Sequence, residues 1–370
     1  MKNAQNGDTL VSRLRALYGQ YGYAQYRMRK FEEYDLYVRN KSFLTSDHII
    51  TFTEPNGKLM ALRPDVTLSI VKNGKATGGV QKVYYKENVY RVDRDAGAFK
   101  EITQVGLECV GEIDAYCKLE VLLLAEQSLQ EISADYVLDV SHLGILSAVL
   151  DEMGAPADLR APLLHAVGEK NLHGVGELCR AAGIPAEKQE ALLTLVSAYG
   201  APGEVLPRLA ALPLGEGGRA ALAEFSAILA AMDDPANGGR IRVDFSVVND
   251  MNYYNGIVFR GFVAGVPAGV LSGGQYDYLV QKMGKGGGAI GFAVYPDLLE
   301  KLLPPTTARD VDAILLYDAG ADLAALRTAV DALIKEGKRV AVRTAVPDKM
   351  TYGQLLRLGE SGVEILEEHA

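Results

Sequence analysis

One stretch of this 370-residue sequence limits the possible folds more than any other: residues 145–236 are rich in alanine and leucine, and they separate two segments with strand character. Proline punctuates the stretch at Pro156, Pro162, Pro185, Pro202, Pro207 and Pro213. Proline suits the first turn of a helix and interrupts its interior, so this spacing predicts short helices that begin or break at prolines. Strand patterns return at residues 241–248 and 256–262, which predicts an all-helical insertion in a discontinuous domain.

The segment before the insertion mixes helices with paired strands. Apolar residues recur at helical spacing over residues 10–22, and residues 114–132 form a second amphipathic pattern, so both are predicted helices. The turn sequence EPNG at residues 54–57 lies between two short apolar runs and predicts a hairpin. Strands are predicted at residues 50–52, 59–62, 83–92 and 101–111.

The end of the sequence alternates between strand and helix patterns, after a segment at residues 304–307 that is typical of a linker. Strands are predicted at residues 311–317, 339–343 and 363–366, and helices at residues 323–335 and 352–358. Alternation of this kind favours a small parallel α/β unit over residues 309–370.

Composition limits the classes of function. The sequence is 48% hydrophobic and 23% charged, as in ordinary globular proteins, and its net charge of -9 favours no nucleic-acid partner. Cys109, Cys117 and Cys179 have no metal-ligand or redox spacing, and the five histidines are scattered, so neither a metal nor a cofactor is expected. No signal-peptide pattern or membrane-spanning run is evident, so we expect a cytoplasmic protein without a membrane partner.

The strand predicted at residues 101–111, with the sequence EITQVGLECVG, has two unlike faces. Because alternate side chains of a strand share a face, one face is core-like and carries Thr103, Val105, Leu107 and Cys109. The other face carries Gln104, Gly106 and Glu108, so two polar side chains flank a residue that has none. A polar ligand held between them would satisfy both groups in a buried setting. A sheet surface open to solvent is the alternative.

A carboxylate and a hydroxyl lie two residues apart in the sequence LRPDVT at residues 62–67. Pro64 keeps Arg63 extended, and Asp65 and Thr67 can then face one site. Such a pair suits an ammonium group, because both side chains accept hydrogen bonds from it. An ordinary turn is the alternative interpretation of the same residues.

Tyrosines next to glycines occur twice, in NYYNG at residues 252–256 and in SGGQYD at residues 272–277. Their hydroxyl groups are suited to contact a ligand, although paired tyrosines also commonly pack in cores and interfaces. The run at residues 286–291 formally matches GxGxxG. No strand pattern precedes it, so we predict a glycine loop that leads into a strand and no dinucleotide site.

These segments together resemble one family. The sequences LRPDVT, YRVDR at residues 90–94, EITQVGLECVG, NYYNGIVF at residues 252–259, GGQYD at residues 273–277 and AIGFAV at residues 289–294 look like class II histidyl-tRNA synthetase motifs, in one order. The resemblance implies an α+β fold with an antiparallel sheet flanked by helices. It assigns residues 1–144 and 237–303 to the core, residues 145–236 to the insertion, and residues 309–370 to a truncated unit similar to an anticodon-binding domain.

The same resemblance implies a pocket for free histidine. Asp65 and Thr67 match positions that hold the α-amino group, and Glu108 and Tyr254 match contacts to the imidazole. A carboxylate beside the ring is a suitable acceptor for an imidazole N–H. The remaining residues that we assign to the pocket are Arg91, Gln104, Tyr253 and Tyr276.

The departures from the synthetase family concern arginines that stabilise charge during adenylate formation. Family arginines are replaced by Ala98, Asn249, Gln275 and Leu298, and the motif 2 loop at residues 93–102 is shortened. Removing one such group typically costs about 10²–10³-fold in rate, so losing several predicts no adenylation and no catalytic residue. Residues 309–370 carry 8 basic and 11 acidic side chains, which predicts no tRNA surface there.

A synthetase core without synthetase chemistry resembles the regulatory subunit family of ATP phosphoribosyltransferase. Members of that family pair with a short-form catalytic subunit in the first step of histidine biosynthesis, and they confer activation and feedback inhibition by histidine. The resemblance therefore implies a non-catalytic chain, a homodimer within a hetero-oligomer, with free histidine as its effector. A divergent, active histidyl-tRNA synthetase and a synthetase-like paralogue of another kind are the alternatives.

Overall fold

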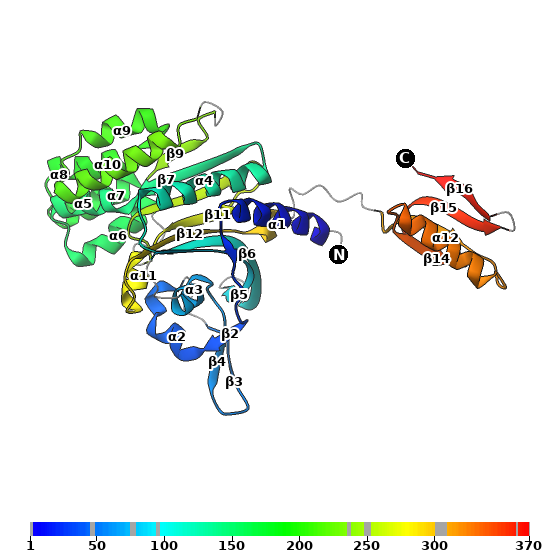
Figure 1. The fold of residues 1–370 in the computed structure, drawn as a ribbon. Coiled ribbons are helices and arrows are strands. Elements are labelled where there is room, and N and C mark those ends of the chain that lie inside the picture. The colour runs from blue at the N-terminus through cyan, green and yellow to red at the C-terminus, as the bar shows by residue number, and fades with distance from the viewer. Residues whose placement is uncertain are drawn as a thin grey trace. The chain divides into compact units, whose positions relative to one another are not determined.

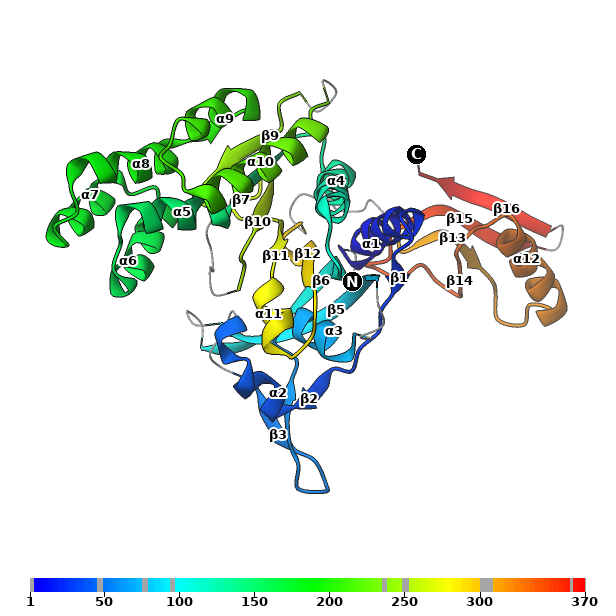
Figure 2. The ribbon, with the colours of Figure 1, turned by 60° about the vertical axis from the view of Figure 1, so that its left-hand side comes forward.

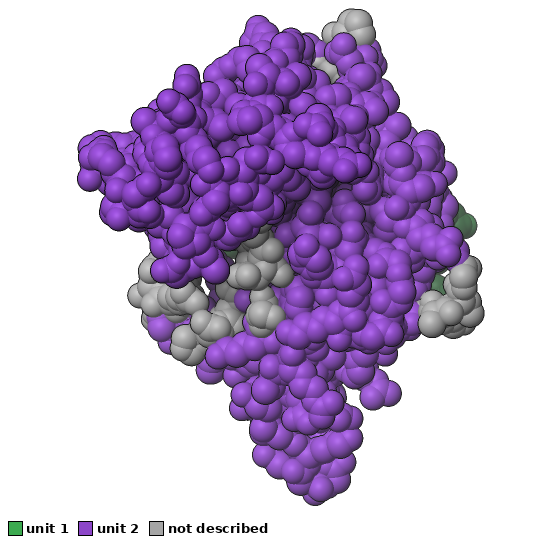
Figure 3. Space-filling view, turned by 90° about the vertical axis from the view of Figure 1, so that its left-hand side faces the viewer, with its two compact units in different colours: residues 1–8, 303–370 green, residues 9–302 purple. Residues whose placement is uncertain are grey.

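The structure is a computed structural model that describes residues 3–44, 49–74, 79–93, 97–234, 238–247, 253–299, 309–359 and 362–369. The chain divides into two compact units, one of residues 1–8 and 303–370 and the other of residues 9–302 (Figure 3). The linker predicted at residues 304–307 lies outside the described residues.

A nine-stranded sheet forms the centre of the larger unit, in the order β1-β5-β6-β12-β11-β10-β7-β9-β8 (Figures 1 and 2). All neighbouring pairs are antiparallel except β1 with β5 and β7 with β9, so the predicted antiparallel sheet is confirmed. The strands are β1 (Ala24–Gln25), β5 (Val80–Asp93), β6 (Ala98–Gly111), β7 (Tyr136–His142), β8 (Tyr199–Gly200), β9 (Ile241–Asp244), β10 (Ile257–Val263), β11 (Leu271–Gln275) and β12 (Gly288–Val294).

Two long helices supply apolar side chains to one face of this sheet. They are α1 (Asn3–Gln20) and α4 (Ala115–Ile132), and both predicted helices are confirmed. The α4 helix begins at Asp114, whose Oδ1 accepts a hydrogen bond from the Cys117 amide at 2.8 Å, as a helix N-cap does. Val105, Leu107 and Cys109 point into the same apolar core, so the predicted core face of the strand is confirmed for these three.

In the described part of the predicted insertion the chain forms six helices, which gather beside β7 and β9 of the sheet (Figures 1 and 2). They are α5 (Leu143–Met153), α6 (Ala157–Gly168), α7 (Leu172–Ala181), α8 (Ala186–Ser197), α9 (Pro202–Ala210) and α10 (Glu216–Ala231). The stretch is not all-helical, because β8 pairs with β9.

Prolines mark the helix starts only in part. Pro156 and Pro185 are N-cap residues and Pro202 opens α9, as predicted. Pro162 and Pro207, however, lie inside α6 and α9, so the prediction that prolines start or break the helices is wrong for them. Buried neighbours in the same helices pack into the core, and this packing offsets the backbone hydrogen bond that proline cannot make.

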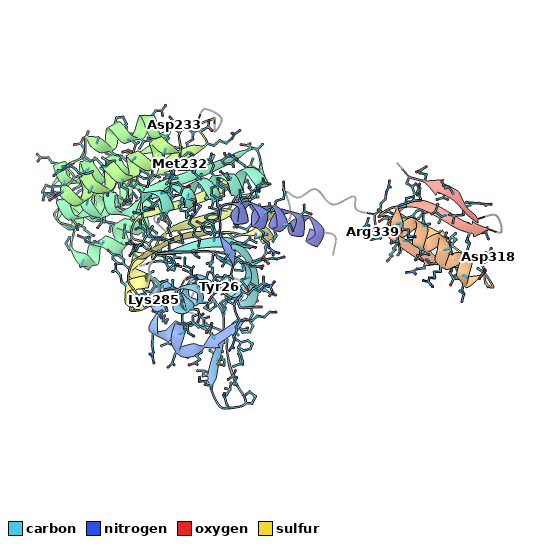
Figure 4. All side chains as sticks on the ribbon, in the orientation of Figure 1. Tyr26, Met232, Asp233, Lys285, Asp318 and Arg339 are labelled. Atoms are coloured by element: carbon cyan, nitrogen blue, oxygen red, sulfur yellow. The ribbon has the colours of Figure 1, made fainter. Side chains whose placement is uncertain are left out.

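A small sheet and short helices complete the larger unit. The sheet has the order β2-β4-β3, with β2 (Phe31–Glu33), β3 (Thr51–Thr53) and β4 (Leu59–Leu62), and it confirms the predicted hairpin. The helices are α2 (Tyr34–Arg39), α3 (Thr67–Asn73) and α11 (Asp277–Lys282), with 3-10 turns at Lys41–Phe43 and Pro296–Leu299. Lys285, labelled in Figure 4, donates hydrogen bonds to the Lys72 and Gly74 carbonyls at 2.9 and 2.6 Å and so closes the end of α3.

The smaller unit has a four-stranded sheet in the order β14-β13-β15-β16. Its elements are β13 (Val311–Leu316), α12 (Leu323–Lys335), β14 (Val340–Arg343), β15 (Tyr352–Gly359) and β16 (Gly362–Glu368). The helix predicted at residues 352–358 is wrong, because this segment is β15. The unit is also not purely parallel, because β16 is antiparallel to β15.

Residues 352–358 form a strand because two adjacent leucines of β15 are both buried. Leu356 packs in the cluster that includes Leu333 of α12, whereas Leu355 packs with Ile314 and Ala341 in a second cluster. A strand sends neighbouring side chains to opposite faces, so both leucines are buried at once. A short helix would lose this double burial, and its nucleation is unfavourable.

Candidate functional site

A cavity of about 300 Å³ lies on the polar face of β6, a volume at the lower end of small-molecule sites. Its lining residues come from β5, β6, β10, β11 and β12, from the start of α3, and from the tyrosine segments before β10 and α11. All eight residues assigned to the pocket from the sequence line it: Asp65, Thr67, Arg91, Gln104, Glu108, Tyr253, Tyr254 and Tyr276.

The floor of the cavity is made of small residues in register across the sheet. Gly106 of β6 lies opposite Ala293 of β12, which lies opposite Ser272 of β11, and Ser272 lies opposite Arg260 of β10. The small side chains of Ala293 and Ser272 leave space above the sheet, whereas Tyr85 takes the space beside Gly106. The cavity therefore follows from strand register, which joins segments far apart in the sequence.

Glu108 is almost completely enclosed, with 2% of its surface exposed. Thr67 Oγ1 donates a hydrogen bond to Glu108 Oε1 at 2.9 Å, and the Tyr276 hydroxyl donates to Oε2. A carboxyl group has hydrogen-bonding capacity beyond these two contacts, so it can also bond to a ligand. Gly291 makes this arrangement possible, because a Cβ at that position would lie 1.8 Å from Glu108 Oε2.

Burial controls the charge of Glu108. It raises the pKa of this carboxyl from 4.5 to about 8, nearby Asp65 adds to the rise, and the hydrogen bonds from Tyr276 and Thr67 oppose it. Glu108 is therefore largely protonated near neutral pH, when it can donate a hydrogen bond as well as accept one. An imidazole, which has one donor and one acceptor nitrogen, matches such a group.

The LRPDVT segment is fixed by its arginine. The fully buried Arg63 donates hydrogen bonds to Glu87 Oε2 and to the Asn88 carbonyl, both at 2.8 Å. Next to it, Asp65 Oδ1 accepts from the Leu68 amide at 2.9 Å. Arg91 Nε donates to the Pro64 carbonyl at 3.1 Å, so a carboxylate and a guanidinium lie side by side at this end of the cavity.

Three tyrosines form an aromatic wall. The rings of Tyr253 and Tyr254 have centroids 4.6 Å apart, and those of Tyr253 and Tyr276 lie 5.7 Å apart. Tyr253 and Tyr276 also belong to a buried apolar cluster, so these two residues both pack in the core and line the cavity. Flat rings of this kind suit stacking against a planar ligand.

Sequence reasoning missed several lining residues. The hole expected at Gly106 is filled, because a Cβ there would lie 2.7 Å from the Tyr85 hydroxyl, and Tyr85 itself lines the cavity. Arg260, Ser272 and Tyr295 also line it. The signal for Arg260 was a lone cation in the apolar strand IVFRGFV, but only its register with Ser272 places it over the same floor.

The positions that the resemblance assigns to family arginines supply no cation within the described residues. Gln275 donates a hydrogen bond from Nε2 to Asp277 Oδ2 at 2.6 Å, and Leu298 is 38% exposed. Asn249 lies outside the described residues. The part of the chain that the structure describes contains no cluster of metal-ligand side chains, and no helix in it is long and apolar enough to span a membrane.

A family model described as histidyl-tRNA synthetase matches residues 2–299. The chain belongs to the histidyl-tRNA synthetase family. A curated relative named ATP phosphoribosyltransferase regulatory subunit, from Alkaliphilus metalliredigens, is 28% identical over 310 residues, which cover 82% of this chain and 78% of the relative. The resemblance to the regulatory subunits is thus confirmed.

Two solved structures confirm the class II fold. An ATP phosphoribosyltransferase regulatory subunit/histidyl-tRNA synthetase from Bacillus halodurans superposes with a TM-score of 0.80 at 23% identity, covering 94% of this chain and 91% of that one. A chain of the ATP phosphoribosyl transferase (HisG:HisZ) complex from Thermotoga maritima superposes with a TM-score of 0.62 at 18% identity, covering 78% and 96%.

Proposed function

We propose that this chain is the non-catalytic regulatory subunit of an ATP phosphoribosyltransferase. In this proposal it binds free histidine in the cavity around Glu108 and activates a short-form catalytic subunit. Histidine binding then inhibits the first step of histidine biosynthesis.

The observation that carries the proposal is the convergence of the eight assigned residues on one cavity. The resemblance adds that Ala98, Gln275 and Leu298 match positions at which the synthetases have arginines. An amino-acid pocket is kept, and part of the charge stabilisation that adenylate formation needs is gone. The names of the relatives also support a regulatory role. The Alkaliphilus metalliredigens relative is named ATP phosphoribosyltransferase regulatory subunit, and the Thermotoga maritima structure is described as an ATP phosphoribosyl transferase (HisG:HisZ) complex.

Each part of histidine has a matching group in the cavity. The imidazole hydrogen-bonds to Glu108 and lies against the tyrosine wall, and the ammonium group binds Asp65 and Thr67. Inhibition then requires that histidine bind one conformation of the complex better than another. Coupling free energies of about 1–3 kcal/mol are typical, which corresponds to about 5–150-fold in affinity.

The test is reconstitution with a short-form catalytic subunit. The two chains should co-purify, the catalytic rate should rise when this chain is added, and histidine should lower the rate of the complex but not that of the catalytic subunit alone. A catalytic subunit that ignores this chain at every ratio would contradict the proposal.

Family membership alone favours a second function, histidine activation for tRNA charging. That function predicts histidine-dependent exchange of pyrophosphate into ATP by the purified chain. We expect no exchange above background under conditions in which calorimetry detects histidine binding. Exchange at an enzymatic rate would replace the regulatory proposal with the synthetase.

A further inference from the structure

Arg260 is a cation of the cavity that the proposed histidine contacts do not use. It lies on β10 directly opposite Ser272 on one side and Asp139 of β7 on the other. It lines the cavity together with Ser272 and Tyr295, whose hydroxyl groups share a hydrogen bond of 2.8 Å. Three groups able to donate hydrogen bonds therefore gather at the β10 side.

The guanidinium of Arg260 has no acceptor among the residues that the structure describes. By contrast, Arg63 is bound to Glu87, and Arg91 donates to the Pro64 carbonyl. An arginine carries five N–H donors and keeps its charge in proteins, so a partly buried one without an acceptor favours an oxyanion. Asp139 lies opposite Arg260, and burial raises the Asp139 pKa while the positive charge of Arg260 acts to lower it, but Asp139 Oδ1 makes no hydrogen bond in the described part of the chain.

The side chain of Arg260 lies over Gly269, where a larger residue would force the arginine to shift. A Cβ on Gly269 would lie 2.7 Å from both Cγ and Cδ of Arg260. Because glycine has no side chain, the aliphatic part of Arg260 can lie against the backbone at Gly269, just before β11. The stem packs against backbone while the residue contributes to the cavity wall.

Arg260 lies well apart from Glu108. Two strands, β12 and β11, separate β6 from β10, so their backbones are about 14 Å apart at the usual spacing of about 4.8 Å per strand. The cavity lining between them includes Ala293 and Ser272. The cavity thus has a carboxylic end at β6 and a cationic end at β10.

We propose that Arg260, with Ser272 and Tyr295, forms an oxyanion-binding subsite at the β10 end of the cavity. The oxyanion is a carboxylate or a phosphate. Its source is either the carboxylate of the amino-acid ligand, which rests on the proposed function, or a second phosphate-bearing small molecule bound beside it, which does not.

The experiment compares Arg260→Gln with Arg242→Gln in the full chain. Arg242 is a matched control, because it also lies directly opposite Asp139, from β9, but does not line the cavity. Calorimetric titrations use histidine, histamine and inorganic pyrophosphate. Histamine keeps the imidazole and the amine of histidine but lacks its carboxylate. Ser272→Ala is the second variant, in case Arg260→Gln unfolds.

If the ligand carboxylate is the source, Arg260→Gln weakens histidine binding by about 10- to 100-fold, as loss of a charge-assisted hydrogen bond does, and leaves histamine binding unchanged. If a phosphate is the source, the variant keeps histidine binding and loses the pyrophosphate binding of the wild type. Ser272→Ala weakens the binding of the same ligand, but to a smaller extent than Arg260→Gln. Arg242→Gln behaves as the wild type in both cases.

Unchanged binding of all three ligands to Arg260→Gln would overturn the subsite, as would a wild type that binds none of them. A wild type that binds pyrophosphate through Arg260 but does not bind histidine would keep the subsite and refute the proposed function. The experiment therefore distinguishes failure of the oxyanion subsite from failure of the proposed function.

Discussion

Two carboxyl groups, one in each unit of the chain, respond to their surroundings in opposite ways. Glu108 of the larger unit is buried with hydroxyl partners only, and burial raises its pKa to about 8. Asp312 of the smaller unit is 39% exposed, and hydrogen bonds from Arg339, labelled in Figure 4, lower its pKa to about 2. One carboxyl is thus prepared to exchange a proton near neutral pH, and the other is a permanent anion.

This contrast indicates where in the chain ligand chemistry can occur. An exposed ion pair is screened by water and contributes little to stability, so the pair of Asp312 with Arg339 fixes local geometry at most. A buried carboxyl without a cation has its proton affinity set by the fold, and a ligand that brings a donor and an acceptor changes it.

Removal of the Glu108 carboxyl should have the largest effect. Glu108→Ala is expected to weaken histidine binding by at least about 100-fold, because a buried polar partner is lost, and to abolish inhibition while activation stays mostly intact. Rate assays of the reconstituted complex measure both effects. Glu101→Ala, an exposed carboxylate on the same strand, is the control. Unchanged inhibition would show that the pocket is placed wrongly.

A methyl group at Gly291 should displace the carboxyl without removing it. The new Cβ would lie 1.8 Å from Glu108 Oε2. Gly291→Ala is therefore expected to weaken histidine binding by about 10- to 100-fold and to lower the free energy of unfolding by about 1–3 kcal/mol. Gly203→Ala is the matched control, because a Cβ there meets nothing within 4 Å. Equal binding by both variants would contradict the geometry of the site.

Histidine binding should be strongest between the imidazole pKa of about 6.5 and the Glu108 pKa of about 8. In that window the carboxyl holds its proton and the ring is neutral, so Glu108 can donate a hydrogen bond to the unprotonated ring nitrogen. Outside it a proton must be released or taken up, at up to about tenfold in affinity per pH unit. Calorimetry across pH tests this, and Glu108→Gln should lose the fall above pH 8. A flat wild-type profile would count against the pairing.

The stability of the ligand-free chain should fall as pH rises through the same group. The folded state holds the Glu108 proton up to about pH 8, whereas the unfolded state releases it from about pH 4.5. The unfolded state therefore binds fewer protons between these values, and the free energy of unfolding decreases by up to about 1.4 kcal/mol per pH unit. The free energy of unfolding, measured with urea at a series of pH values, should fall more steeply with pH for the wild type than for Glu108→Gln. The same pH dependence in both proteins would refute the effect of burial on Glu108.

The smallest effect is expected in the smaller unit. A chain ending at residue 303 should bind histidine as the full chain does, because every described residue that lines the cavity belongs to residues 9–302. Calorimetry of the two chains at equal concentration measures the comparison. A tenfold weaker affinity of the shortened chain would give the smaller unit a role in the pocket.

The sequence alone determined the elements whose signals are local. Alternation of apolar and polar residues predicted β6 and its two faces, helical spacing predicted α1 and α4, and the EPNG turn predicted the hairpin of β3 and β4. The eight pocket residues were also found in advance, because the motif resemblance joined segments that no local signal connects. Their role in binding histidine stays a prediction.

Tertiary structure decided what depends on partners distant in the chain. Residues 352–358 form a strand because Leu355 and Leu356 are buried on opposite faces of a sheet that the segment itself does not encode. Arg260 enters the cavity because its strand pairs with β11, and Glu108 acquires its pKa because Thr67, Tyr276 and Gly291 close around it. Burial and register are properties of the assembled chain, and no short sequence pattern contains them.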